Sequence, residues 1–270
     1  MLTYAKEIAE CPDVSAENAS FPGVHGWSAT EFRERFSRLL MNHAQFTDSV
    51  LLTNRAYVVR TARDFSDISA ALKIRASVYG AMGYIRPFNP NAALDSYNGF
   101  EVPDEYDCTS TFILLERRGV TIGTARIIPD NSEVGLPAAR IYGASTLESL
   151  LPAARYSRAE LSRLCILEEF RNTFAMFNMV GGMYAFGVGS AEGKGTTCAF
   201  LFESIPGRMV ELYSKVGAKA TGMVQPHAVG SSAELMVWPL DRAVTHYVEK
   251  WGELTRSQNI SQRESPLALR

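Results

Sequence analysis

Charged residues occur inside a segment that otherwise has the composition of a buried strand, residues 159–166 (AELSRLCI). Its carboxylate and its guanidinium lie three positions apart, and charges are rarely buried in a strand unless they are paired or take part in chemistry. Two further acids, Asp104 and Asp107, and two arginines, Arg75 and Arg126, lie upstream. If these opposite charges converge on one cleft, they form a polar active site.

Composition and charge exclude several classes of protein. The chain has 270 residues, 46% of them hydrophobic, which is enough for one substantial core or for one core with an appendage. A net charge of −2 and a pI near 6.1 give no basic excess, so no nucleic acid is expected as the main partner. The four cysteines show neither a CxxC pair nor metal-ligand spacing, and we predict no metal site and no Ser/His/Asp triad.

The expected location follows from the same sequence features. The first residues lack a positive start followed by an apolar block, so no signal peptide is expected. The longest apolar stretch, residues 174–188, is short and interrupted by glycines, so no transmembrane segment is expected either. Free cysteines fit a reducing compartment, and we expect a cytoplasmic protein.

The chain is expected to fall into three parts. Residues 1–55 form an N-terminal helical extension with a helix from about 28 to 43, residues 56–256 form the main domain, and residues 257–270 form a disordered tail. The extension could cap the sheet, mediate dimers or cover a substrate pocket, and the sequence leaves these roles open.

Within the main domain, hydrophobic periodicity predicts an alternation of strands and helices. The expected strands are 57–60, 111–116, 120–128, 159–166, 196–202, 221–224 and 233–238, and the expected helices are 64–79, 172–189 and 206–217. For residues 80–102 we predict an irregular loop, and for residues 130–155 a variable segment. This order indicates an α/β (α+β) fold, a mixed sheet with helices on both faces.

Four short motifs occur in a fixed order along these elements. They are Arg75-x-x-x-Tyr79, Asp104-Glu105-Tyr106-Asp107, Gly123-Thr124-Ala125-Arg126 and Glu160-Leu161-Ser162-Arg163. In this order the chain resembles the GNAT-type N-acyltransferases over residues 57–240, and most closely the branch of acyl-homoserine lactone (autoinducer) synthases and long-chain N-acyl amino acid synthases.

Two details favour one side of that branch. Autoinducer synthases carry a tryptophan shortly after the aromatic at the Tyr79 position, whereas the next aromatic here is Tyr84. Residues 206–217 (PGRMVELYSKVG) look like the general acyltransferase helix that ends in Tyr-x-x-x-Gly. Both favour an N-acyl amino acid synthase, or another GNAT enzyme, over a lactone synthase.

The resemblance implies an N-acyltransferase without a bound cofactor. It would move a fatty acyl group from acyl carrier protein, as a phosphopantetheine thioester, or from acyl-CoA, to the α-amine of an amino acid or related small amine. One alternative is an autoinducer synthase that uses S-adenosylmethionine and serves quorum sensing. A second alternative is a catalytically silent GNAT-like binding module.

Acyl transfer to an amine needs a base for the ammonium, donors for the carbonyl oxygen and a proton for the leaving thiolate. Glu160 is the candidate base, and the alternative is a structural ion pair with Arg163, Arg126 or Arg75. Residues three apart on a strand face opposite sides, so Glu160 and Arg163 share a cleft only if the strand bulges, as the resemblance implies. Tyr213 could protonate the thiolate or could simply pack in its helix.

Substrate-binding roles are expected for the remaining charged residues of the motifs. Asp104 and Asp107 could attract a cationic amine or cap a loop. Arg75 and Arg126 could pair with those acids or bind an acceptor carboxylate. From the resemblance, Tyr79 and Arg163 also belong to the substrate-binding set. The expected acyl-chain pocket consists of Phe112, Phe174, Phe177 and Met183, and core packing is the alternative for these residues.

The donor is predicted from the turn at residues 167–172, which opens the helix after the central strand. GNAT enzymes usually bind the pyrophosphate of coenzyme A on a Gly-rich turn at this place, but LEEFRN contains no glycine and two acids. This favours a carrier protein as donor, with Arg155, Arg158 and Arg171 as docking residues or as ordinary surface arginines.

Overall fold

The computed structural model describes residues 49–85, 96–97, 99–130, 134–171, 173–191, 195–205, 207–226 and 232–240, together with Glu34 and Ser37. Glu34 and Ser37 are helical, and the rest of the predicted helix at 28–43 lies outside the described residues. The predicted tail at 257–270 also lies outside them. None of the described helices is both long enough and apolar enough to span a membrane.

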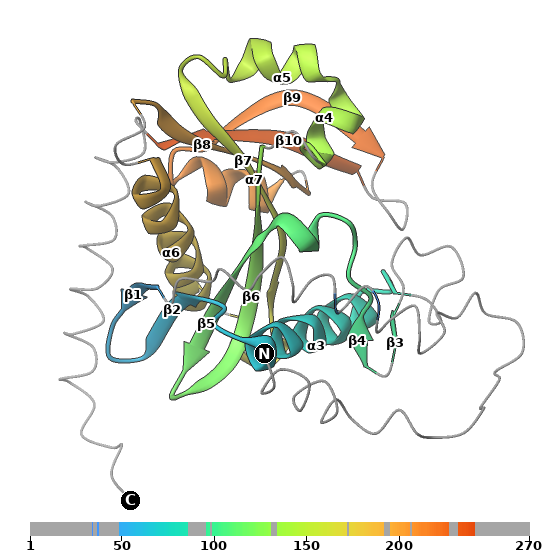
Figure 1. The fold of residues 1–270 in the computed structure, drawn as a ribbon, viewed down its shortest axis with the longest axis vertical. Coiled ribbons are helices and arrows are strands. Elements are labelled where there is room, and N and C mark those ends of the chain that lie inside the picture. Colours follow the sequence, from blue (N-terminus) through green and yellow to red (C-terminus); the bar gives the residue numbers. More distant parts are fainter. Residues whose placement is uncertain are drawn as a thin grey trace, which may run out of the picture.

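One eight-stranded sheet organises the molecule (Figure 1). Its strand order is β1-β2-β5-β6-β7-β8-β10-β9, and every neighbouring pair is antiparallel except β7 and β8, which are parallel. The strands are β1 (Val50–Thr53), β2 (Tyr57–Thr61), β5 (Thr111–Arg117), β6 (Val120–Pro129), β7 (Tyr156–Ile166), β8 (Thr197–Ser204), β9 (Lys219–Pro226) and β10 (Ser232–Pro239). A separate small hairpin consists of β3 (Ser96–Tyr97) and β4 (Phe100–Glu101).

Helices connect the strands and cover both faces of the sheet. They are α3 (Phe65–Ala81), α4 (Pro137–Tyr142), α5 (Ala144–Leu150), α6 (Thr173–Ala191) and α7 (Arg208–Ser214), with short 3₁₀ turns η1 (Asp107–Thr109) and η2 (Glu168–Phe170). α3 begins after Asp64, whose side chain accepts a hydrogen bond from the backbone N–H of Asp67. This cap satisfies one of the free donors of the first turn.

The two faces of the sheet are distinguished by the side-chain alternation of the strands. On β5, Phe112 and Leu114 pack against α3, whereas Ile113 and Leu115 pack in the cluster that contains the buried residues of α6. Figure 1 draws α6 and α3 on opposite sides of β5 and β6. α4 and α5 cover the same face as α3 but farther along the sheet, over β7, β8 and β10. We call this the α3 face, and the other the α6 face.

Glycines let α6 approach the sheet closely. A Cβ atom at Gly182 would lie 2.2 Å from Val59 Cγ1, and one at Gly187 would lie 2.5 Å from Leu240 Cδ1 and 2.7 Å from the ring of Phe200. Both distances are too short for real carbon contacts, so this packing requires glycine at the two positions.

The predicted mixed sheet with helices on both faces is confirmed, including the hairpin β5–β6 and the strand β7. β1, the small hairpin β3–β4 and the helices α4 and α5 were not predicted. β1 starts at Val50, so the sheet begins inside the range assigned to the N-terminal extension. The segment expected to be variable, residues 130–155, contains α4 and α5.

Candidate active site

The central strand β7 contains the bulge that the site requires. β6 pairs Thr124 with Cys165 and Arg126 with Ser162, so β7 has one residue more than β6 between these pairs. Arg163 occupies the bulge with a positive φ of 55°, a backbone conformation that few non-glycine residues adopt. Ser162 and Arg163 therefore both face the α3 side, and the predicted bulge is confirmed.

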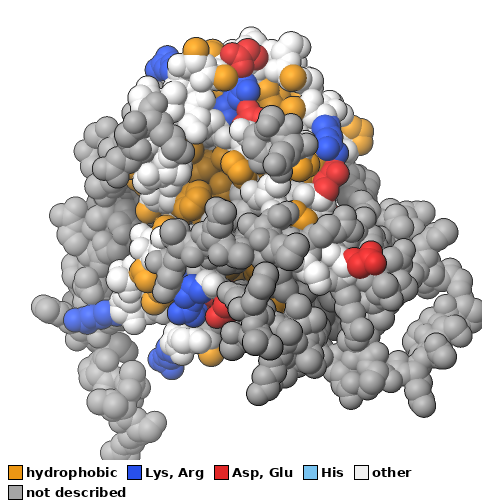
Figure 2. Space-filling view, viewed as in Figure 1, with side chains coloured by type: hydrophobic (Ala, Val, Ile, Leu, Met, Phe, Trp, Pro, Cys, Tyr) orange, Lys and Arg blue, Asp and Glu red, His pale blue; other side chains and the backbone are white. Residues whose placement is uncertain are grey.

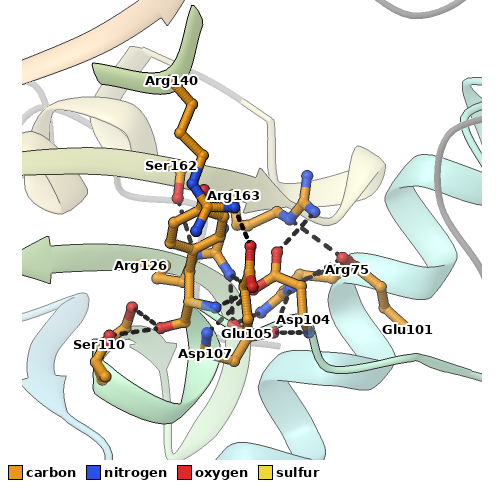
Figure 3. A network of polar contacts seen from close by, with 12 residues as sticks. Arg75, Glu101, Asp104, Glu105, Asp107, Ser110, Arg126, Arg140, Ser162 and Arg163 are labelled. Carbon is orange, nitrogen blue, oxygen red and sulfur yellow. Dashed lines mark hydrogen bonds and ion pairs between the residues drawn. The ribbon is translucent and has the colours of Figure 1, made fainter. Parts of the chain in front are cut away.

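A network of six charged residues lies on the α3 face beside this bulge (Figure 3). Arg75 of α3 is one of its buried members and is 1% exposed. The Arg75 guanidinium donates to both carboxylate oxygens of Glu101 at 2.9 and 2.8 Å and to those of Asp107 at 2.9 and 3.2 Å. Two buried carboxylates therefore balance the positive charge of Arg75.

Arg126 of β6 links this inner group to the loop before η1. Its Nη1 donates to Asp104 at 2.5 Å and to Asp107 at 2.8 Å, and its Nε donates to Ser162 Oγ at 2.9 Å. Asp104 Oδ1 also accepts the backbone N–H groups of Tyr106 and Asp107. This last arrangement is the loop capping that was one of the two alternatives for Asp104.

Arg163 and Asp104 form the outer edge of the network. Arg163 Nη2 donates to Asp104 Oδ2 at 3.2 Å, and its Nε forms an ion pair with Glu101 Oε1 at 3.1 Å without a hydrogen bond. The guanidinium also lies 5.7 Å from the ring centre of Tyr79. The Arg163 and Asp104 side chains are 22% and 28% exposed, so this edge is open to a ligand.

The arginines of the network favour the ionised form of Asp107. Burial alone would raise the pKa of Asp107, but the Arg75 and Arg126 guanidinium groups outweigh it and hold this pKa well below its usual range. The Asp107 and Glu101 carboxylates hold the pKa of Arg75 above its usual value despite burial. Asp107 and Arg75 therefore form a buried ion pair, which is the structural alternative left open for Arg75.

Glu160 lies in different surroundings on the same face of β7. It is 5% exposed, and its Oε2 accepts a hydrogen bond of 2.7 Å from the backbone N–H of Ala138 at the start of α4. Burial raises the pKa of Glu160 to about 7, against the opposing effects of the Ala138 N–H and Arg126, and the negative charge of Glu203 adds to the rise. Glu160 can thus exchange a proton near neutral pH.

Strands β7 and β8 part beside Glu160. Among the described residues, their parallel ladder ends at the pair Glu160–Leu201, after which β7 continues beside β6 and β8 continues beside β10. Backbone groups of the two strands beyond this point do not bond to each other, so the sheet opens next to the carboxylate. A substrate that crosses the sheet here would reach Glu160.

Tyr213 lies on the α6 face near this opening. It belongs to α7, and its ring packs edge-on against Phe202 of β8 with centres 4.7 Å apart. Burial raises the pKa of Tyr213 to about 12, so its hydroxyl stays protonated at neutral pH. Phe202 follows Leu201 directly, so Tyr213 lies just past the last β7–β8 pair, on the face opposite to Glu160.

Three of the four predicted acyl-pocket residues lie together on α6. Met183 is buried in the cluster under α6, and Phe174 and Phe177 are partly buried against it. Figure 2 shows apolar atoms gathered in the middle of one face, in the area where Figure 1 draws α6 and α7. Phe112 is separated from these three by the sheet, because strand alternation turns it toward α3, where it lies 5.7 Å from the Arg75 guanidinium.

Two acids of this face were not identified from the sequence. Glu101 is 1% exposed and pairs with Arg75 and Arg163. Its position between Phe100 and Val102 was a usable signal, because an acid between large apolar residues is often buried and paired. Glu203 in β8 shares the face of Glu160, and the segment FESI carried a similar signal.

The arginines considered for carrier docking differ in their contacts. Arg158 is paired with Asp130 and Glu148, whereas Arg155 lies 5.0 Å from the ring centre of Tyr156. Arg171 donates to the carbonyl of Ile166 at 2.8 Å.

The chain is similar to known proteins in sequence and in fold. A family profile for the N-acyl amino acid synthase FeeM matches residues 70–238, more than half of the chain. The solved structure of FeeM, an N-acyl amino acid synthase from uncultured soil microbes, aligns with 72% of this chain and 96% of its own at 18% identity and a TM-score of 0.54. The AHL synthase LasI aligns with 69% of this chain and 92% of its own at 14% identity and a TM-score of 0.51. No curated protein sequence matches the chain significantly.

The two solved structures share the overall fold of this chain, and the predicted GNAT-like fold class, a mixed sheet with helices, is confirmed. The chain belongs to the FeeM N-acyl amino acid synthase family and is an acyltransferase. The predicted resemblance to the autoinducer and N-acyl amino acid synthase group is confirmed.

Proposed function

We propose that this acyltransferase moves a fatty acyl group from a carrier-protein thioester to the α-amine of an amino acid or a related small amine. The observation that carries the proposal is Glu160, a buried carboxylate with a pKa near 7 beside the point where β7 and β8 part. A base with this pKa is suited to remove a proton from an ammonium group at neutral pH. The family assignment supports an amine as acceptor.

The reaction can be assigned to residues on both faces of the sheet. The acceptor approaches from the α3 face, and Glu160 takes one proton from its ammonium group. The amine nitrogen then attacks the thioester carbonyl carbon, the C–N bond forms and the C–S bond breaks. Tyr213 on the α6 face gives its proton to the departing thiolate, because its hydroxyl is protonated throughout the neutral range. The nitrogen releases its second proton to solvent as the amide forms, and Glu160 and Tyr213 return to their starting protonation states by proton exchange with solvent.

The acceptor is proposed to contact the exposed edge of the charged network. Arg163 and Asp104 are its accessible members, so Arg163 is suited to bind an acceptor carboxylate and Asp104 to orient Arg163. Arg75, Asp107 and Arg126 are buried and engaged with one another, and we assign them to positioning this edge. Tyr79 supports the Arg163 guanidinium with its ring.

A carrier protein rather than coenzyme A is the proposed donor. Glu168 and Glu169 are exposed in η2, directly before the start of α6. Negative side chains stabilise the first turn of a helix, but they repel a pyrophosphate at the same place. The acyl chain is proposed to lie along Phe174, Phe177 and Met183 on the α6 face.

Mass spectrometry of the purified protein tests this proposal. The protein is incubated with a panel of acyl carrier proteins and acyl-CoA donors, and with amino acids or S-adenosylmethionine as acceptors. We expect an N-acyl amino acid with a carrier donor. A lactone together with methylthioadenosine would instead identify an autoinducer synthase, and no product from any pair would contradict the proposal.

A matched pair of variants tests the role of Glu160. We expect Glu160→Gln to lower turnover by roughly 100-fold or more, the range attributed to a general base, while the fold persists. Glu211→Gln removes the same charge from an exposed position of α7 and should leave turnover unchanged. Wild-type turnover in Glu160→Gln would remove Glu160 from the mechanism.

A further inference from the structure

A second carboxylate, Glu203, lies beside Glu160 and has no role in the reaction described above. β8 pairs Glu160 with Leu201, and Glu203 follows two residues later on the same face. Its antiparallel partner on β10 is Leu235, a member of the cluster under α4 and α5. The strands are about 4.8 Å apart at the Glu160–Leu201 pair and separate beyond it, so with a rise of about 3.3 Å per residue the Cα atoms of Glu160 and Glu203 lie at least about 8 Å apart.

Glu203 is held in place by α4. The Tyr142 hydroxyl donates a hydrogen bond of 2.9 Å to Glu203 Oε1. Burial and this bond raise the pKa of Tyr142 above its usual value, so Tyr142 remains a donor at every pH at which the protein works. The same helix supplies the Ala138 N–H that bonds to Glu160. α4 therefore positions both carboxylates.

The charges around the two acids leave their negative charge unbalanced. The groups that face Glu160 are Arg126 from β6, Tyr106 from the loop before η1, the Ala138 N–H and Tyr142 from α4, and Glu203 from β8. Arg126 is already bonded to Asp104, Asp107 and Ser162. Within the described part of the chain, neither Glu160 nor Glu203 forms an ion pair with a basic side chain.

We propose that Glu203 and Glu160 together form a two-carboxylate cradle for the ammonium group of the acceptor. Glu160 takes the proton, Glu203 binds the ammonium through its remaining N–H groups, and Tyr142 is a positioning residue for Glu203. The cradle selects acceptors that arrive as primary ammonium ions and disfavours neutral hydroxyl acceptors of similar size. This inference rests on the proposed function, because it assigns the amine-binding part of that site.

Steady-state kinetics of Glu203→Gln test the cradle. We expect the KM for the amine acceptor to rise about tenfold, the worth of one charge-assisted hydrogen bond, with kcat within about threefold of wild type. The acid limb of the kcat/KM profile should move to lower pH by about 0.5, because Glu160 loses a negative neighbour. Tyr142→Phe should raise KM by a smaller factor, and Glu211→Gln on the other face should change neither value.

A second readout needs no substrate. The carboxyl titration of Glu160 can be followed by NMR of ¹³C-labelled glutamate. Its midpoint should be lower in Glu203→Gln than in wild type, and it should be unchanged in Glu211→Gln. If wild type forms an N-acyl product, an unchanged midpoint or an unchanged acceptor KM in Glu203→Gln would overturn the cradle and leave the proposed function intact. Absence of any N-acyl product from wild type would instead overturn the proposed function.

Discussion

Two groups of buried acids lie on the α3 face of the sheet, and they differ in how completely they are paired. Asp107 and Glu101 each form ion pairs with two arginines, at distances of about 3 Å. Glu160, a short way along β7, accepts one backbone N–H and has Glu203 as a like-charged neighbour. The first group has its charge fully compensated, and the second has a carboxylate that can change its charge near neutral pH.

The difference indicates a division of labour on one face. Removing one member of a fully paired buried group leaves an uncompensated charge, so such a group stabilises a single arrangement of the loop, α3 and β6. A carboxylate with few partners exchanges a proton with little rearrangement, which is what a base requires. Acids with perturbed pKa values thus serve two purposes in this site. The lowered pKa of Asp107 marks a structural ion pair, and the raised pKa of Glu160 marks a candidate base.

The largest expected effect is on the paired group. Asp107→Asn should lower the free energy of unfolding by about 3–5 kcal/mol, because Arg75 and Arg126 lose a buried partner. Since the pKa of Asp107 is lowered, its contribution is present above the ordinary carboxyl pKa and is lost as the pH falls. Urea denaturation at pH 7 measures the loss. Glu105→Gln, which breaks the exposed pair with Arg140, should change stability by less than about 1 kcal/mol; equal effects of the two variants would remove the distinction between paired and exposed acids.

The next effect concerns Glu160 and has the opposite sign. Its pKa is raised from 4.5 to about 7, so the folded state favours the protonated form and loses this stabilisation as the pH rises through 7. Glu160→Gln should therefore be more stable than wild type by up to about 3 kcal/mol at pH 8.5, and similar to wild type at pH 4. Denaturant titrations at the two pH values measure the difference. A difference that does not depend on pH would contradict the raised pKa.

A smaller effect is expected at the edge of the charged network. Arg163→Lys keeps the charge but loses the planar fork, so the KM for a carboxylate-bearing acceptor should rise by about tenfold. Because the side chain is partly exposed, the loss of stability should stay below about 1 kcal/mol. Initial rates and thermal melts separate the two outcomes. A large loss of stability with an unchanged KM would place Arg163 with the structural group instead.

The smallest effect is expected on the α6 face. Tyr213→Phe keeps the packing against Phe202 and removes only the hydroxyl, so kcat should fall by roughly tenfold with the acceptor KM unchanged. A thioester with a better leaving group should recover part of the loss, because it needs less help from a proton donor. Unchanged kcat with the ordinary donor would leave Tyr213 a packing residue.

Much of the fold was predictable because its elements carry local signals. Asp64 and the apolar spacing after it indicate α3, and the turn at 117–119 between two apolar runs indicates the hairpin β5–β6. β1 and the helices α4 and α5 were not predicted. α4 and α5 are 6 and 7 residues long and lack a side-chain cap, so tertiary packing rather than local preference stabilises them.

The site was predicted less completely, and for a physical reason. Glu160, Arg163 and Asp107 could be selected because each belongs to a motif, but the roles of such residues depend on which side chains surround them. Glu101 and Glu203 belong to none of the motifs and enter the site only through strand pairing and the small hairpin β3–β4. Phe112 was grouped with residues on α6, and only the parity of β5 shows that it faces α3.

The titration of the Glu160 carboxyl group in the free protein tests the central claim most directly. NMR of ¹³C-labelled glutamate, with Glu160→Gln to assign the signal, gives its midpoint without knowledge of either substrate. The account predicts a midpoint near 7, well separated from the exposed glutamates. A midpoint between about 4 and 5, together with the exposed acids, would show that Glu160 is charged at neutral pH like any surface glutamate and would contradict its role as the base.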